Sequence, residues 1–241
     1  MHTYNMLAHG DRVLIAVSGG VDSLVLAWLL QFWQRKAPIS YDFLAVHIDM
    51  EPEKGLPGVT AEKVRKQLDI LGIRSIIAPA AWQPSSRSIT DKSGTRKVCY
   101  HCSSSRRRQL FDFARRHQYN KIAFGHHQDD IIETFFINIC FAGNISTMVP
   151  RQDLFSGRLS LIRPLAFLAK KDIIHMAQQL GFEPVRSLCP LREKTGRKDI
   201  RHILSELYDR VPEARQHIFT ALANVRHEYL LKYPGKKYSG V

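Results

Sequence analysis

The sequence lacks the features of a membrane-embedded or secreted protein. No apolar run approaches the roughly 20 residues that a membrane-spanning helix needs. The first residues, MHTYNMLAHGDR, lack the apolar core of a signal peptide. We therefore expect a cytoplasmic protein with no membrane partner. With 241 residues, of which 44% are hydrophobic, the chain is long enough to bury a full core.

Acidic residues are scarce relative to basic ones. The chain has 22 Asp and Glu against 35 Lys and Arg, which gives a formal net charge of +13 and a pI of about 9.8. Such an excess favours a polyanionic partner, nucleic acid first and an anionic membrane second. Because no long apolar segment supports the membrane interpretation, nucleic acid is the partner that we expect.

Cysteine is also sparse, with four residues in the whole chain. Cys99 and Cys102 form a Cys-x-x-Cys pair, no second such pair exists, and Cys189 is the next candidate to join them. In a reducing compartment, these cysteines are better read as metal-binding or catalytic than as disulfide-bonded. Cys140 lies at the end of an apolar stretch, FFINICF, where we expect an inert core residue.

Strand-like and helix-like segments alternate along the chain, as in α/β proteins. We expect a Rossmann-like parallel sheet with helices on both faces and a helical C-terminal extension. Residues 1–190 would form the main domain, and 191–241 a basic helical extension. The predicted strands are 12–17, 41–48, 74–79, 121–125 and 159–165, and the predicted helices are 21–33, 56–72, 103–118, 129–141, 169–181 and 211–231. Residues 79–98 would form a long loop and 143–160 an irregular segment.

The stretch AVSGGVDSL directly follows the first predicted strand and opens a helix. Two glycines allow a tight turn whose N–H groups point inward, and the positive end of that helix faces the same spot. Hydroxyl and carboxylate groups there suit phosphate and Mg²⁺. The pattern is neither a Walker loop nor a dinucleotide fingerprint. We expect a phosphate site built from Ser18, Gly19, Gly20, Asp22 and Ser23, with Asp22 also holding Mg²⁺.

Two further groups fall at the carboxyl ends of predicted strands, where ligands of such sheets bind. His47 ends the second strand, where the backbone could read adenine. Gly125 ends the fourth strand and leads into GHHQDD, whose Asp130 we expect to be catalytic. His126 and His127 suit either a core position or a ribose contact. Asp49 suits a turn.

Several motifs together resemble the tRNA 2-thiocytidine synthetase family of PP-loop ATP pyrophosphatases. They are SGGVDS, CYHC, FGHHQDDIIETFFIN, LIRPLAFLAKKDI and SLCP, in the order and spacing of that family. Position 21 is Val where many members carry Lys.

The resemblance implies a fold of the PP-loop ATP pyrophosphatase type and an ATP-dependent enzyme. ATP would adenylate the C2 carbonyl of a pyrimidine, for which the family implies an anticodon-loop cytidine. Sulfur would then replace the oxygen, with release of AMP and pyrophosphate.

The resemblance also bears on the cysteines. Three thiolates, from Cys99, Cys102 and Cys189, suit a [4Fe-4S] cluster that leaves one iron open to sulfide. A dithiol or persulfide ranks second, and zinc third, because structural zinc usually takes four ligands. We expect Cys189 to take part in catalysis with Asp22 and Asp130. The expected cofactors are the cluster, ATP and Mg²⁺.

Basic residues near the cysteines are candidates for RNA contacts. Arg106 follows Cys102 by one helical turn and could meet a phosphate near the cluster. After Cys189 comes a second basic stretch, from which we expect contacts by Arg197, Lys198 and Arg201. Arg192 and Lys194 belong to the same stretch.

The expected partners are tRNA and a sulfur donor, either a cysteine desulfurase or inorganic sulfide. A homodimer is one option for the assembly. Other functions remain open from the sequence. They are a tRNA 2-thiouridine synthetase, a lysidine-synthetase-like tRNA ligase and a non-catalytic iron–sulfur RNA-binding protein.

Overall fold

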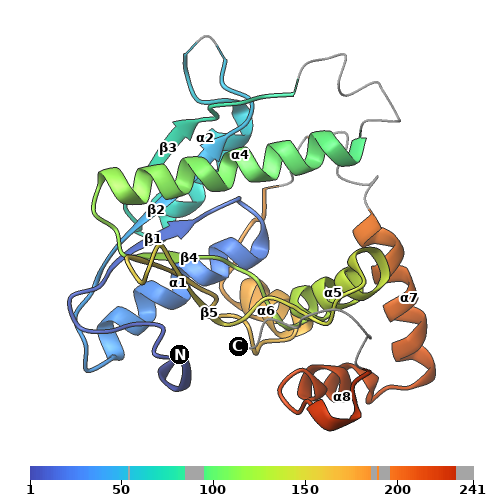
Figure 1. Cartoon of the computed structure of the whole chain (residues 1–241). Coiled ribbons are helices and arrows are strands. Elements are labelled where there is room, and N and C mark those ends of the chain that lie inside the picture. The colour runs from blue at the N-terminus through green and yellow to red at the C-terminus, as the bar shows by residue number, and fades with distance from the viewer. Residues whose placement is uncertain (54, 85–94, 186–188, 190–195, 232–241) are drawn as a thin grey trace.

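The computed structural model describes residues 1–53, 55–84, 95–185, 189 and 196–231 (Figure 1). Its centre is a six-stranded sheet in the order β3-β2-β1-β4-β6-β5. The strands are β1 (Arg12–Ala16), β2 (Asp42–Asp49), β3 (Ser75–Pro79), β4 (Lys121–Ala123), β5 (Arg151–Leu154) and β6 (Leu159–Ile162). All neighbouring strands are parallel except the β5–β6 pair at one edge. The predicted α/β fold with a mainly parallel sheet is therefore confirmed.

Strand order reverses between β1 and β4. From β1 the chain adds β2 and then β3 on one side, and it later places β4 and β6 on the other. Open α/β sheets bind ligands at such a reversal, beyond the carboxyl ends of the strands. The loop after β1 and the GHHQDD segment after β4 flank this point, as predicted.

Helices cover both faces of the sheet, because side chains of successive strand residues point to opposite faces. In β1, Val13 and Ile15 pack with α1, α2 and α6, whereas Leu14 packs on the other face with α4. Both layers are apolar and buried, which accounts for the near-continuous hydrophobic strands of the sequence. The helices are α1 (Val21–Lys36), α2 (Val59–Ile70), α4 (Thr95–Arg116) and α6 (Lys170–Gln179).

A further helical group lies beside the sheet, to the lower right in Figure 1. Ile132 of α5 packs against Ile200 and Leu204 of α7 in a small apolar cluster of its own. A short π-helical turn extends α5. The elements are α5 (Gln128–Ile137), η2 (Asn138–Ala142), α7 (Gly196–Arg210) and α8 (Ala214–Ala221).

Several boundaries differ from the prediction. The helix expected at 103–118 begins at Thr95, so Cys99 and Cys102 lie within it. No Pro or Gly interrupts 95–102, and the polar composition that suggested a loop belongs to the residues before it. Part of that predicted loop, 85–94, lies outside the described residues. The expected helix 211–231 is α8 followed by turns and a 3-10 segment, η3 (His227–Tyr229).

Two further expectations were wrong. The segment 143–160 contains β5, an edge strand whose RQDL sequence has no apolar run to reveal it. Cys140 is exposed on η2, not buried in the core, and none of the residues of η2 is buried. No helix among the described residues is long and apolar enough to cross a membrane.

Candidate functional site

The loop after β1 is folded around one hydroxyl. Ser23 Oγ accepts hydrogen bonds from the backbone N–H groups of Ser18, at 3.2 Å, and Gly19, at 3.1 Å. It donates to the Gly20 carbonyl at 2.9 Å, and Gly20 is the N-cap of α1. The loop is therefore folded against the first turn of α1, whose positive end favours an anion.

Two glycines are needed at this spot for different reasons. Gly19 has φ +86°, and an added Cβ would lie 2.5 Å from Val64 Cγ2. An added Cβ at Gly125 would lie 3.0 Å from the Asp22 carbonyl. The end of β4 thus passes directly against the first turn of α1, which brings the GHHQDD segment to the loop.

Asp22 points toward a lysine that we did not single out from the sequence. Lys170 Nζ lies 2.5 Å from Asp22 Oδ1, in an ion pair that links the start of α6 to the start of α1. Lys170 is the first residue of α6, where a cation opposes the helix dipole. That unfavourable position within LAKKDI is the sequence signal that could have revealed it.

The histidine next to Asp22 is surrounded by carboxylates. The His127 ring is buried, and its Nε2 lies 3.3 Å from Asp130 Oδ2 and 3.7 Å from Asp22 Oδ1. Its Nδ1 lies 3.6 Å from Asp129 Oδ2. Asp130 also accepts the His127 backbone N–H at 3.2 Å. The two predicted catalytic acids, Asp22 and Asp130, therefore meet at one imidazole.

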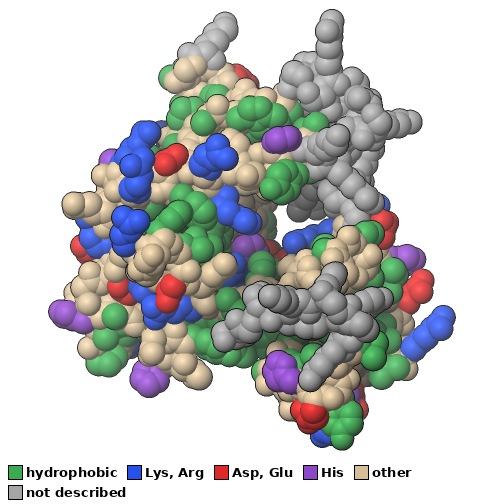
Figure 2. Space-filling view, viewed as in Figure 1, with side chains coloured by type: hydrophobic (Ala, Val, Ile, Leu, Met, Phe, Trp, Pro, Cys, Tyr) green, Lys and Arg blue, Asp and Glu red, His purple; other side chains and the backbone are tan. Residues whose placement is uncertain are grey.

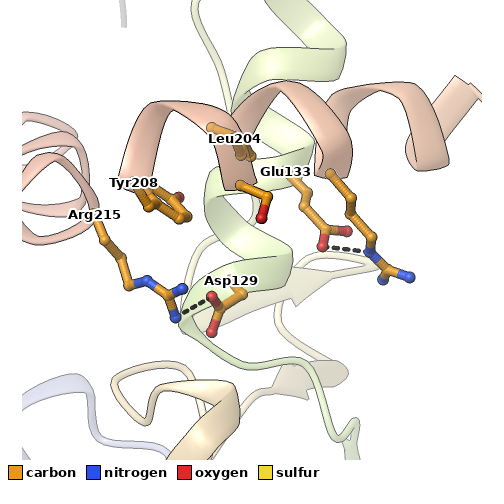
Figure 3. A pocket seen from close by; sticks show the side chains of 7 residues that line it. Asp129, Glu133, Leu204, Tyr208 and Arg215 are labelled. Atoms are coloured by element: carbon orange, nitrogen blue, oxygen red, sulfur yellow. Dashed lines mark hydrogen bonds and ion pairs between the residues drawn. The ribbon is translucent and has the colours of Figure 1, made fainter. Parts of the chain in front are cut away.

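The carboxylates of α5 are paired with arginines of α7 and α8 (Figure 3). Arg215 Nη1 lies 2.5 Å from Asp129 Oδ1 and Arg201 Nε 2.6 Å from Glu133 Oε1. Arg197 Nη1 lies 3.3 Å from Asp130 Oδ1. A cavity of about 150 Å³ lies among these groups, lined by Asp129, Glu133, Arg201, Leu204, Ser205, Tyr208 and Arg215.

His47 and Asp49, at the end of β2, have different surroundings. His47 Nδ1 lies 2.8 Å from the Val17 carbonyl, and burial lowers its pKa, so the ring is neutral near pH 7. Asp49 accepts the backbone N–H groups of Glu51, at 2.9 Å, and Gly58, at 2.8 Å. His47 faces the loop, whereas Asp49 is engaged in a turn.

The cysteines of the predicted cluster lie near one another. Cys99 and Cys102 are half-buried in α4, and Cys189 is exposed. Burial raises the pKa of Cys99, the thiols of Cys189 and Cys102 raise it further, and Arg106 opposes them. As the side chains stand, no three His, Cys, Asp or Glu of the described residues form a metal-binding group. Three thiolates that repel one another nevertheless suit a cationic iron–sulfur group, since its charge relieves that repulsion.

The predicted RNA contacts fall into two groups. Arg106 and Lys198 are exposed, whereas Arg197 and Arg201 are held by carboxylates of α5. Arg192 and Lys194 lie outside the described residues. Figure 2 shows Lys and Arg side chains around a hollow in the face of the molecule seen there.

These features define a PP-loop enzyme. A glycine loop at the strand-order reversal, an acid in the first turn of the next helix and a second acidic helix start all meet at one sheet edge. The family model for the PP-loop domain matches residues 2–207. The chain belongs to the PP-loop family.

Curated relatives narrow the family. The chain is 34% identical over 233 residues to tRNA-cytidine(32) 2-sulfurtransferase 1 of Francisella tularensis subsp. novicida, covering 96% of this chain and 85% of the relative. It is 32% identical over 230 residues to tRNA-cytidine(32) 2-sulfurtransferase of Geobacter metallireducens, covering 95% and 87%. The resemblance to tRNA 2-thiocytidine synthetases, read from the motifs, is therefore confirmed.

A solved structure agrees in fold. The U34-tRNA thiolase NcsA of Methanococcus maripaludis, determined with its [4Fe-4S] cluster, superposes with a TM-score of 0.70. The match has 21% sequence identity and covers 91% of this chain and 73% of that one. At this identity, the likeness establishes the shared fold.

Proposed function

We propose that the protein is an ATP-dependent tRNA sulfurtransferase that converts a cytidine to 2-thiocytidine. The observation that carries the proposal is the 34% identity to a tRNA-cytidine(32) 2-sulfurtransferase across 96% of the chain. The charge of +13 agrees with a nucleic-acid substrate.

The first half of the reaction is assigned to the loop after β1. The C2 carbonyl oxygen attacks the α-phosphorus of ATP, and the bond to pyrophosphate breaks. The start of α1 would bind the departing phosphates, and the N–H groups of Gly19 and Gly20 would join it by exchanging their bonds to Ser23 Oγ and Ser18 Oγ for phosphate oxygens. Asp22 would hold Mg²⁺, with Lys170 moving from its carboxylate to a phosphate oxygen and so supplying the cation that Val21 does not.

The second half is assigned to the edge that carries the cysteines. A sulfur nucleophile attacks C2, the C–O bond breaks, and the oxygen leaves with AMP. Cys99, Cys102 and Cys189 would hold a [4Fe-4S] cluster, which supplies a binding place for sulfide. Asp130 would transfer the proton at the reacting base. His127, whose Nε2 lies 3.3 Å from Asp130 Oδ2, would fix the orientation of the Asp130 carboxylate.

Binding of tRNA is assigned to exposed and half-exposed cations near both sites. Arg106 and Lys198 are free to meet phosphates. Arg197 and Arg201 keep N–H groups beyond those paired with α5, and 58% of the Arg201 side chain is exposed. The two arginines would therefore serve RNA contact and helix packing together.

Pyrophosphate release tests the ATP-dependent half. Purified protein with ATP, Mg²⁺ and tRNA is expected to release pyrophosphate, and Asp22→Asn to lower that rate at least about 100-fold, since it removes a charge at the reacting phosphates. Asp42→Asn, an exposed acid at the other end of the sheet, is the matched control and should leave the rate unchanged. No tRNA-dependent release by the wild type would favour a non-catalytic RNA-binding protein.

A further inference from the structure

A second group of basic side chains lies beside the GHHQDD segment. Arg163 directly follows β6 and is buried, with 6% of its surface exposed. Its backbone N–H donates to the Pro150 carbonyl at 2.8 Å, and its Nη1 donates to the Val149 carbonyl at 2.5 Å. These two bonds anchor the guanidinium at the carboxyl edge of the sheet.

The anchored guanidinium is not neutralised by the described part of the protein. None of the ion pairs found there involves Arg163, and its buried Nε has no hydrogen-bond partner. A buried charge without a counter-charge destabilises a fold, so buried charges in proteins are usually paired with a group of opposite charge. The arrangement calls for an anion from outside the described residues.

His126 lies next to Arg163 and has a donor or acceptor of its own to satisfy. Phe124 donates its N–H to the Ile162 carbonyl at 3.0 Å, which sets the end of β4 beside the end of β6. His126 Nδ1 is buried and has no hydrogen-bond partner among the described residues. A neutral imidazole whose proton lies on Nδ1 can donate that proton to an anion.

Arg107 of α4 is the third member of the group. It is exposed, and its positive charge lowers the pKa values of both His126 and Arg163. Two buried groups that directly follow β4 and β6, His126 and Arg163, therefore lie near an exposed cation of α4.

We propose that Arg163, His126 and Arg107 form a binding site for a backbone phosphate of the tRNA, next to the nucleotide that reacts. This inference rests on the proposed function. The loop after β1 is assigned to the phosphates of ATP, whereas the new site uses His126 of the GHHQDD segment and Arg163, which directly follows the neighbouring strand β6. A phosphodiester held there would leave its base within reach of Asp130. Arg107, on the surface, would guide the strand inward.

Salt-dependent tRNA binding tests the site. Arg163→Met keeps the length and apolar part of the side chain, and we expect the slope of log affinity against log salt to fall by about 0.7, one phosphate contact with single-stranded RNA. Arg107→Gln should do the same, and ATP affinity should not change in either variant. Arg108→Gln, at the next position of α4 and also exposed, is the matched control and should keep the wild-type slope.

The outcomes separate this inference from the proposed function. Wild-type slopes in both variants, in a protein that still thiolates tRNA, overturn the phosphate site alone. A loss of ATP affinity with an unchanged slope also overturns it, because the group then serves the nucleotide. If melting curves show that Arg163→Met does not fold, the salt slopes of Arg107→Gln and Arg108→Gln decide whether the phosphate site exists. A wild type that binds no tRNA removes the proposed function as well.

Discussion

Lys170 begins α6, where its charge opposes the helix dipole, yet its ammonium lies 2.5 Å from Asp22. We expect Lys170→Gln to slow tRNA-dependent pyrophosphate release by about 100-fold, as loss of one group that stabilises transition-state charge typically does. Lys171→Gln changes the next, exposed residue of the same helix and should have little effect. Equal rates in the two variants would remove Lys170 from the reaction.

His126 should make the stability depend on pH. Burial lowers its pKa to about 4 from an ordinary 6.5, with Arg163, Arg197 and Arg107 adding to the shift and Asp130 opposing it. Between these values the unfolded chain takes up a proton that the folded one does not, so stability falls as pH falls through this window.

Replacing that histidine tests the effect. His126→Gln should flatten the decline of the free energy of unfolding between about pH 6.5 and pH 4, measured by denaturant titration at several pH values. His202→Gln, on the exposed face of α7, is the control and should leave the profile unchanged. An unaltered profile for His126→Gln would show that its pKa is close to that in the unfolded chain.

Some residues of the candidate site could be predicted from the sequence because a local pattern marks them. Ser18, Gly19 and Asp22 follow a strand and open a helix, which is a local pattern. Lys170 and Arg163 meet that site only through α6 and β6, whose placement depends on the packing of the whole sheet. Side chains brought in by distant elements leave little local signal.

At the scale of elements, α5 and α7 are joined by charge as well as by apolar packing. Glu133 is buried to 7% side-chain exposure and pairs with Arg201 at 2.6 Å. Arg201→Ala should lower the free energy of unfolding by about 1–2 kcal/mol, since a buried carboxylate loses its partner while Arg197 stays 3.7 Å away. Thermal or urea unfolding measures it.

A control and a double-mutant cycle sharpen this test. Arg210→Ala, at an exposed position of α7, should change stability by less than about 0.5 kcal/mol. Glu133→Gln combined with Arg201→Ala should cost less than the sum of the two single changes. Strict additivity would mean that the pair contributes no coupling energy.

The sheet could be predicted because its strands are apolar on both sides and alternate with helices. β5 could not, since an edge strand such as RQDL needs neither face buried and its pairing with β6 is set by the turn between them. The early start of α4 was missed for a related reason. The Pro, Ser, Thr and Gly residues of 79–94 extended the predicted loop to 98, although nothing in 95–102 stops a helix.

For the whole molecule, the cysteines of α4 and of the segment after α6 must act together. Anaerobically reconstituted protein should take up about four irons per chain and absorb as an iron–sulfur protein. Alanine at Cys99, Cys102 or Cys189 should abolish that absorption, whereas Cys140→Ala, an exposed site on η2, should not. Stoichiometric zinc binding without iron uptake would contradict the assignment.

The central claim is that the protein exchanges oxygen for sulfur at C2 of a tRNA cytidine. Nucleoside mass spectrometry tests it most directly, on unmodified tRNA incubated with reconstituted protein, ATP, Mg²⁺ and sulfide. The account predicts 2-thiocytidine that forms only with ATP present and is lost with Asp22→Asn. The appearance of 2-thiouridine or lysidine in its place, or of no modified nucleoside from a cluster-loaded protein that binds tRNA, would contradict it.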